Sequence, residues 1–151
     1  MKNQTRRSIS AAAIALSFAA CGAAQAHDAT RSCVESTLRG LYVLSASGFN
    51  IAGGVAVPKA IVESIRFNGD GSLHSPAATV SINGNILHFA DAPGSYTVET
   101  NCTGTLTFPG VATWDLFIAP SGSEIFMIQT GPTSTPPGSP VFQGIARRVS
   151  R

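Results

Sequence analysis

Hydrophobic and polar residues alternate along much of this chain, most clearly at residues 96–108. There, residue types suited to a core stand at even positions, while the odd positions hold threonine, glutamate and asparagine. Successive side chains of a β-strand point to opposite faces, so a period of two predicts strand structure with one buried face. The core-facing positions are Tyr96, Val98, Cys102, Leu106 and Phe108.

Short runs with the composition of β-strands continue from Leu41 almost to the end of the chain. Residues that favour turns separate them, at 68–71, 83–85, 93–94 and 120–123. Nine strands are predicted, at 41–47, 61–67, 73–82, 86–89, 95–100, 105–108, 113–118, 125–130 and 141–149.

A single meander of this size leaves two unpaired edges unless it closes on itself. We therefore expect an all-β fold, a small antiparallel up-and-down β-barrel of 8-9 strands, in preference to a sandwich. The two longest segments without predicted structure, 48–58 and 131–140, would be loops placed to lie over a barrel mouth.

The segment before the first strand has helical signals. Ser32 and Glu35 fit a capping box, Leu38 follows on the helical period, and Gly40 can end a helix in the left-handed conformation. We expect a short N-terminal helix that carries Cys33.

Residues 96–108 admit two arrangements. As a hairpin with a three-residue loop, they pair Val98 with Leu106, and Gly104 takes the left-handed conformation that a bulge requires. As one long strand kinked at Gly104, they keep the same faces. The alternation fits both arrangements equally well.

The first 26 residues have the parts of an export signal. Basic residues precede an apolar run at 9–20, and Ala24-Gln25-Ala26 forms an A-x-A cleavage site. The run is shorter than the roughly 20 residues that span a bilayer, so no membrane span is expected. Cleavage after Ala26 gives a signal peptide, 1–26, and a single β-barrel domain, 27–151, in the periplasm or secreted.

Two details leave the export route open. Arg6 and Arg7 resemble a twin-arginine signal for folded export, although two arginines also suit the basic segment of an ordinary signal. Small residues before Cys21 offer an alternative cleavage site with a lipidated cysteine, but Phe18 stands where such sites usually have leucine.

Removal of the signal changes the charge. The full chain has a net charge of +2, but three of its ten lysines and arginines lie in the signal. The remaining seven stand against eight acidic residues, which gives −1. This charge predicts no basic face for nucleic acid.

Cleavage leaves two cysteines, Cys33 and Cys102. Two thiols cannot supply the four ligands of a structural zinc site, and a free thiol nucleophile is hard to keep reduced in an oxidising compartment. We expect one disulfide. It would close a loop of 69 residues and stabilise the fold by up to about 4 kcal/mol.

The segment GSYTV at 94–98, followed by CTGT at 102–105, resembles the G-x-Y-x-V...C-T-G-T segment of small exported bacterial proteins, largely uncharacterised. LRGLY at 38–42 is similar to the opening strand of the same group, and the resemblance covers most of 33–149. It implies a calycin-type or allene-oxide-cyclase-type barrel enclosing a cavity for an apolar ligand. The catalytic positions of the cyclases have no match here, so none is carried over.

Three residues are candidate ligand contacts: Glu63, Trp114 and Arg147. Glu63 has the parity of apolar positions 61, 65 and 67, and Arg147 has that of 141, 145 and 149, so both are expected to point into the barrel. If both point inside, Glu63 and Arg147 would form an ion pair, or the carboxylate would be available to a ligand. The alternative is a bulge, or a strand open to solvent on both faces.

His27, at the expected mature terminus, is the candidate metal ligand. Its α-amine and imidazole can bind copper together, with His74 or His88 completing the site. The alternative is a polar terminus left by cleavage, since no motif such as H-x-x-x-H is present. No other cofactor is predicted.

Motifs for hydrolysis or phosphate binding, G-x-S-x-G and G-x-x-x-x-G-K-[ST], do not occur in the mature chain. The sequence favours a protein that binds a small apolar molecule in its barrel. One alternative is a structural or interaction protein of the cell envelope with a filled core. Another is a cyclase-like enzyme whose interior acid, such as Glu63, would have a raised pKa.

Overall fold

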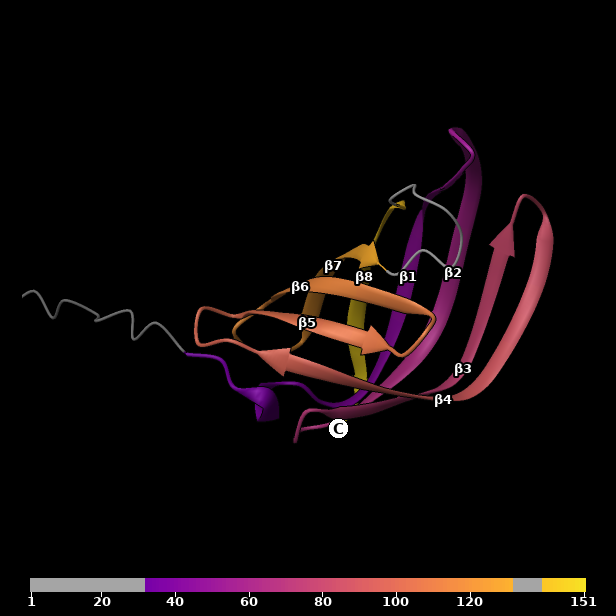
Figure 1. Cartoon of the computed structure of the whole chain (residues 1–151). Helices are drawn as coiled ribbons and strands as arrows, with labels where there is room; N and C mark the ends of the chain where they lie inside the picture. The colour runs from indigo at the N-terminus through magenta and orange to yellow at the C-terminus, as the bar shows by residue number, and fades with distance from the viewer. Residues whose placement is uncertain (1–31, 132–139) are drawn as a thin grey trace, which may run out of the picture.

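Eight antiparallel strands form a closed barrel in the computed structural model, which describes residues 32–131 and 140–151 (Figure 1). Each strand pairs with the next in the chain, and β8 pairs with β1 to close the barrel. The strands are β1 Arg39–Ala52, β2 Val55–Asn68, β3 Ser72–Ile82, β4 Asn85–Val98, β5 Thr103–Phe108, β6 Ala112–Ile118, β7 Glu124–Gly131 and β8 Val141–Ser150. The predicted all-β, up-and-down barrel is confirmed, with eight strands.

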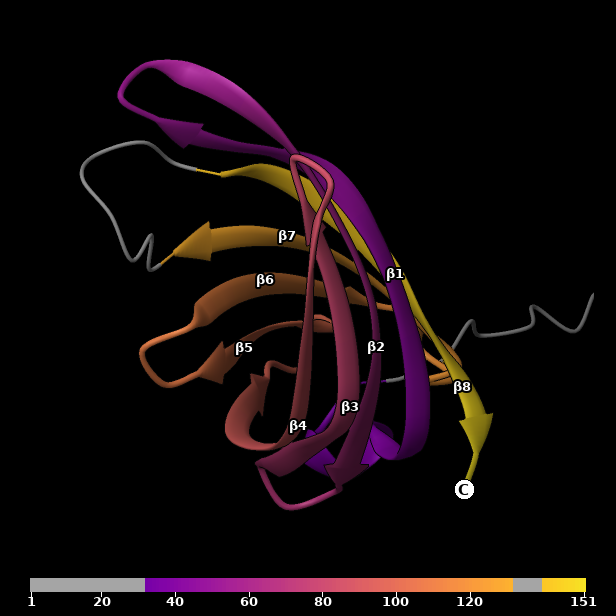
Figure 2. The ribbon, with the colours of Figure 1, turned by 90° about the vertical axis from the view of Figure 1, so that its right-hand side faces the viewer.

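The first four strands are longer than the last four. β1 to β4 contain 11 to 14 residues, whereas β5 to β8 contain 6 to 10. The β1–β2 and β3–β4 hairpins therefore extend as two ribbons past one end of the barrel (Figure 1), and the β1–β2 ribbon stands out at the top of Figure 2. We term this end the mouth, and the opposite end, beside the 3-10 turn η1 (Glu35–Thr37), the closed end.

The loop expected at 48–58 is instead the tip of the β1–β2 hairpin. β1 continues to Ala52 and β2 begins at Val55, joined by Gly53 and Gly54. Both glycines have positive φ, 58° and 80°, as a two-residue hairpin turn requires. The prediction was wrong because these glycines form one tight turn between strands. The other expected loop, 131–140, lies mostly outside the described residues.

The Pro93-Gly94 pair was predicted to be a turn but lies within β4. The predicted strands 86–89 and 95–100 therefore belong to one strand. A Cβ on Gly94 would lie 2.7 Å from Leu73 Cδ1 and 2.8 Å from the carbonyl oxygen of Thr107. The glycine therefore permits close approach of neighbouring strands. Nearby Asp91, with φ 52°, interrupts the regular pairing of β3 with β4.

Residues 96–108 form a hairpin, so the alternative of a single kinked strand is wrong. The register also differs from the expected one, because Val98 pairs with Gly104 rather than with Leu106. The backbone N–H of Glu99 donates to the carbonyl oxygen of Thr103 at 2.8 Å, so the connecting loop has the three residues expected, 100–102. Its left-handed residue is Cys102, at φ 64°, and not Gly104 as expected. A shift of two residues keeps each side chain on its face, so the predicted strand faces hold although the partners change.

The N-terminal segment forms a single turn, η1, where the sequence predicted a short helix. Cys33 is held by a disulfide and β1 begins at Arg39, which leaves room for one turn only. Leu38, just after η1, is fully buried. Tyr96 Oη lies within hydrogen-bond distance of the carbonyl oxygens of Glu35 and Leu38, at 2.9 and 3.0 Å.

The expected disulfide between Cys33 and Cys102 is confirmed, with their Cα atoms 4.9 Å apart. It joins the segment before η1 to the β4–β5 loop. The backbone N–H of Cys33 also donates to the carbonyl oxygen of Thr100, at 3.3 Å. The N-terminal segment is thus fastened to the closed end.

Aromatic and aliphatic side chains fill the interior at the closed end. Phe67 packs edge-on against both Tyr42 and Tyr96, with ring centroids 5.0 and 4.9 Å apart. Such pairs contribute about 0.5–1.5 kcal/mol each beyond burial. Further fully buried residues are Leu44, Ile65, Leu106, Leu116 and Ile125. This half of the barrel is a packed core.

Candidate functional site

Four polar side chains lie inside the barrel, on the mouth side of this core. Lys59 and Glu63 come from β2, Ser75 from β3 and Gln129 from β7. The odd positions of β2 point inward, so Lys59 and Glu63 alternate with isoleucines on the inner face. Glu63 is 7% exposed, Ser75 and Gln129 are buried, and Lys59 is half-buried. We refer to these four residues as the interior polar cluster.

Lys59 reaches across the interior to β7 and β8. Its Nζ donates to Oε1 of Gln129 at 3.3 Å and lies 4.4 Å from the centroid of the Phe142 ring. Phe142 packs in turn against Trp114 of β6, with ring centroids 5.5 Å apart. A cation over an aromatic face is stabilised by about 0.5–2 kcal/mol. Gln129 and Phe142 therefore fix the position of the ammonium group.

Burial disturbs the ionisation of both charged members. Loss of water raises the pKa of Glu63, opposed by a hydrogen bond from Ser75 and by the charge of Lys59. Loss of water lowers the pKa of Lys59, opposed by the charge of Glu63. Both shifts favour the neutral form. Every buried side-chain nitrogen and oxygen of the described residues has a hydrogen-bond partner. Within the cluster, Lys59 pairs with Gln129 and Ser75 with Glu63.

Two of the three predicted ligand contacts lie in the interior. Glu63 belongs to the polar cluster, and Trp114 is buried. Arg147 instead lies on the outer face, with its side chain 71% exposed and its Nε donating to Oε1 of Glu124 at 2.8 Å. The inward prediction for Arg147 was wrong because the even positions of β8 face the core. The valines at 141 and 149, which suggested the opposite parity, are exposed.

Sequence reasoning missed Lys59, Ser75 and Gln129. Lys59 has the same parity as Glu63, but it stood next to the segment expected to be a loop, before the predicted start of the strand. Extending that strand toward its N-terminal end would have found it. Serine and glutamine are mostly exposed in folded proteins, so the sequence carried no signal that Ser75 and Gln129 lie inside.

Apolar side chains continue the inner face beyond the polar cluster, on the β3–β4 hairpin. Leu87 and Phe89 stand opposite Val80 and Ala78, and Ala78 stands opposite Glu63 of β2. Directly opposite residues of antiparallel strands share a face. Val80 and Ala78 are buried, yet Leu87 is 44% and Phe89 51% exposed. The inner face of the mouth thus presents open apolar surface beside the buried polar groups.

The predicted copper ligand, His27, lies outside the described residues, as does the predicted signal peptide. Of its candidate partners, His88 stands opposite Thr79 on the outer face, with Nδ1 3.2 Å from the threonine hydroxyl. Within 32–131 and 140–151, no three His, Cys, Asp or Glu side chains are grouped to hold a metal ion. Copper binding at His27 stays a prediction.

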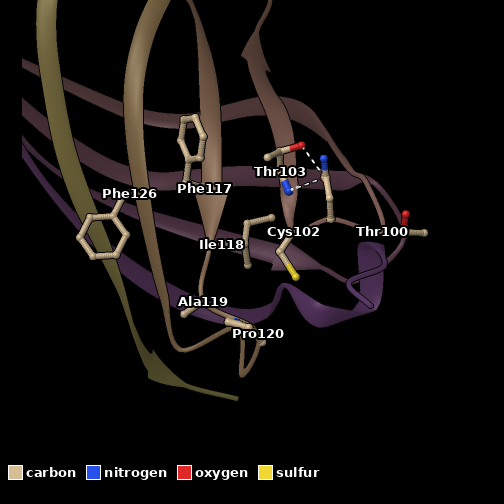
Figure 3. Close-up of a pocket in the computed structure, with 9 residues that line it drawn as sticks. Thr100, Cys102, Thr103, Phe117, Ile118, Ala119, Pro120 and Phe126 are labelled. Atoms are coloured by element: carbon tan, nitrogen blue, oxygen red, sulfur yellow. Dashed lines mark hydrogen bonds between the residues drawn. The ribbon is translucent and has the colours of Figure 1, made fainter. Parts of the chain in front are cut away.

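A separate hollow of about 500 Å³ lies on the outer surface near the closed end (Figure 3). The β4–β5 loop and the end of β6 line it, and Phe117 and Phe126, paired across β6 and β7, form an exposed apolar wall. None of its lining residues has a side chain that titrates, since Cys102 is in the disulfide. This hollow offers contact surface without an acid, a base or a charge.

Comparisons with protein-family models, curated proteins and solved structures find no match to this chain. In the part of the chain that the structure describes, no helix is both long and apolar enough to cross a membrane. A functional proposal therefore rests on the interior polar cluster and its surroundings.

Proposed function

We propose that the protein binds a small, largely apolar molecule at the mouth of the barrel, with a polar group of that molecule at the interior polar cluster. The observation that carries this proposal is the position of buried Glu63, Ser75 and Gln129 and of half-buried Lys59 inside a mainly apolar interior. Burying charged groups costs free energy, and well-packed hydrophobic replacements are often as stable or more so. Folding alone therefore gives no reason for this cluster.

The mouth supplies the apolar part of the proposed site. Leu87 and Phe89 lie on the inner face of β4 and remain about half exposed. Covering such a side chain contributes about 1.5–3 kcal/mol when the burial is complete. A molecule with its polar group at Glu63 and its apolar body along the β3–β4 hairpin would use both features.

Export belongs to the same proposal. Residues 1–26 have the parts of a signal peptide, and the disulfide between Cys33 and Cys102 suits an oxidising compartment. We infer a periplasmic or secreted protein that meets its ligand outside the cytoplasm.

Trp114 makes the proposal testable, because it is the only tryptophan of the chain and lies in the interior beside Phe142. We expect the neutral apolar fluorophore N-phenyl-1-naphthylamine to bind saturably and to accept excitation energy from Trp114. Native mass spectrometry of protein from the periplasm, compared with its denatured mass, should show an organic molecule that is lost on denaturation. The same spectrum reports whether the chain begins at His27.

Two neighbouring residues of β4 provide a matched pair of variants. Leu87→Asp places a charge on the inner face and should weaken fluorophore binding at least about tenfold, the equivalent of 1.4 kcal/mol. Ile86 is similarly exposed but lies on the outer face, so Ile86→Asp should leave binding unchanged. Equal losses in both variants, or no saturable binding, would contradict the proposal. The interaction protein with a filled core would then be the better reading.

A second candidate function is acid–base chemistry on the bound molecule, favoured by the raised pKa of Glu63. A carboxyl group whose pKa approaches the working pH can donate and recover a proton efficiently. Glu63→Gln keeps the size of the side chain but cannot transfer a proton. If Glu63 is catalytic, this variant should retain the unreacted natural ligand in its native mass spectrum, whereas the unaltered protein retains product. If both proteins retain the same mass, the result supports binding without catalysis.

A further inference from the structure

The closed end has a feature that the interior site does not use: a pocket of about 570 Å³ lined by three arginines. It lies between the segment around η1, the β6–β7 turn and the end of β8. The polar residues that line it are Ser36, Thr37, Arg39, Ser121, Arg148 and Arg151.

The seam between β1 and β8 brings the arginines together. These strands are antiparallel, with Leu41 opposite Ser150, so the start of β1 meets the end of β8. The backbones approach closely at Gly40, where φ is 118° and an added Cβ would lie 2.2 Å from the carbonyl oxygen of Ser150. Arg39 and Arg151, adjacent to these two residues, therefore flank the same seam.

Arg148 is held in a fixed orientation. Its Nε donates to the hydroxyl oxygen of Tyr42 at 2.9 Å, and its Nη2 donates to the carbonyl oxygen of Thr37 at 2.8 Å. The guanidinium carbon lies 5.3 Å from the centroid of the Tyr42 ring. Neither hydrogen bond uses Nη1, so one edge of the guanidinium group can still donate to a ligand.

The positive charges of the pocket are not paired with carboxylates. Among the described residues the only ion pair joins Arg147 to Glu124, outside the pocket. The pKa of Asp70 is lowered mainly by hydrogen bonds from Ser72, and the charge of Arg39 is the smallest of the causes. Three like charges around one pocket repel one another. An anion among them would remove that repulsion.

We propose that this pocket binds a phosphate-class oxyanion, either inorganic phosphate or the phosphate group of a small ester or lipid head group. Guanidinium groups donate paired N–H bonds to phosphate oxygens, and a serine hydroxyl can add single bonds. Arg148 is the preset donor, and Arg39 and Arg151 are exposed side chains that can close on the anion. The site lies at the opposite end of the barrel from the mouth.

Isothermal titration with inorganic phosphate and with glycerol phosphate, at constant ionic strength set by chloride, tests the proposal. We expect saturable binding of one anion per chain, weakened at least about tenfold in the double variant R39Q/R151Q. The double variant R66Q/R147Q removes the same charge from arginines outside the pocket and should change the affinity less than about twofold. Near-ultraviolet circular dichroism checks that both variants fold. Arg148 is left unchanged because its hydrogen bonds support the closed end.

The outcomes separate a built site from general attraction to positive charge. Absence of saturable binding, or equal losses in the two double variants, would overturn the proposal. Vesicles with and without phosphatidic acid distinguish the source of the phosphate group. Binding to the acidic vesicles that R39Q/R151Q abolishes, and that inorganic phosphate displaces, would support a lipid head group. Vesicle binding insensitive to both variants, without binding of the soluble anions, would also overturn it.

Discussion

The closed end and the mouth belong to one continuous sheet but differ in their interiors, which are tightly packed and apolar at the closed end and partly polar and open toward the mouth. At the closed end, Phe67 lies between two buried tyrosines, and the disulfide fastens the N-terminal segment to the β4–β5 loop. Toward the mouth, β2 places Lys59 and Glu63 inside, and Phe89 is left half exposed on the inner face. Apolar packing and covalent constraint thus concentrate at one end of a continuous sheet.

Because of this difference, the closed end can supply most of the stability of the barrel while the mouth holds the proposed ligand site. Regions with few buried apolar contacts contribute little to the free energy of unfolding, and sites for ligands are drawn from such regions. At the closed end, Leu38, Tyr42 and Phe67 are almost completely buried, and such burial supplies most of the stabilisation of a core. The mouth can therefore contain groups that disfavour folding. Variants at the two ends should separate these roles.

The largest expected difference comes from replacing one phenylalanine at each end. Phe67→Ala should lower the free energy of unfolding by about 3–5 kcal/mol, because it opens a cavity between Tyr42 and Tyr96. Phe89→Ala, at a half-exposed position of the mouth, should change it by less than about 1 kcal/mol. Equilibrium unfolding in urea measures both. Similar losses of unfolding free energy at the two positions would contradict the difference between the two ends, since the mouth would then be part of the stabilising core.

Removing the disulfide should have the next largest effect. The double variant C33S/C102S frees the N-terminal segment from the β4–β5 loop and should cost about 2–4 kcal/mol of unfolding free energy. Reduction of the unaltered protein should give a similar loss. Because the bond lies at the closed end, fluorophore binding at the mouth should persist in the variant below its melting temperature. Loss of that binding while the barrel stays folded would show that the two ends are coupled.

Glu63→Gln should change the free energy of unfolding least of the three, and the sign of that change with pH tests the cost of burying the carboxylate. Burial raises the pKa of Glu63 above its ordinary 4.5, so the folded chain keeps this proton to higher pH than the unfolded chain does. The associated stability is complete below pH 4.5 and is lost as the pH rises through the raised value. Glutamine does not ionise, so the variant should lack this loss. Urea unfolding from pH 4 to pH 7 compares the two proteins.

A variant that becomes less stable relative to the unaltered protein as the pH rises from 4 to 7 would contradict the expectation. Such a result would mean that the hydrogen bond from Ser75 and the charge of Lys59 outweigh the cost of burying the carboxylate of Glu63. The mouth interior would then stabilise the fold, and the contrast between the two ends would be smaller than proposed.

The alternation of side chains was sufficient to predict the barrel class and the core face of residues 96–108. It could not fix their register, because a shift of two residues preserves every face. It failed for Arg147, because exposed valines on the outer face of β8 imitate a core pattern. It missed Lys59 because glycines at the hairpin tip resemble a loop, and the polar contact of Lys59 with Gln129 joins strands far apart in the sequence.

The seam between β1 and β8 has a consequence for how the barrel assembles. The hydrogen bond from Arg148 to Tyr42 joins residues 106 positions apart, whereas the other strand pairs join consecutive strands. Contacts between distant residues form slowly because a long loop must close first. Until then, β1 and β8 are free edges on which another chain can add a strand. A newly made chain is therefore most prone to aggregate in the interval before its first and last strands meet.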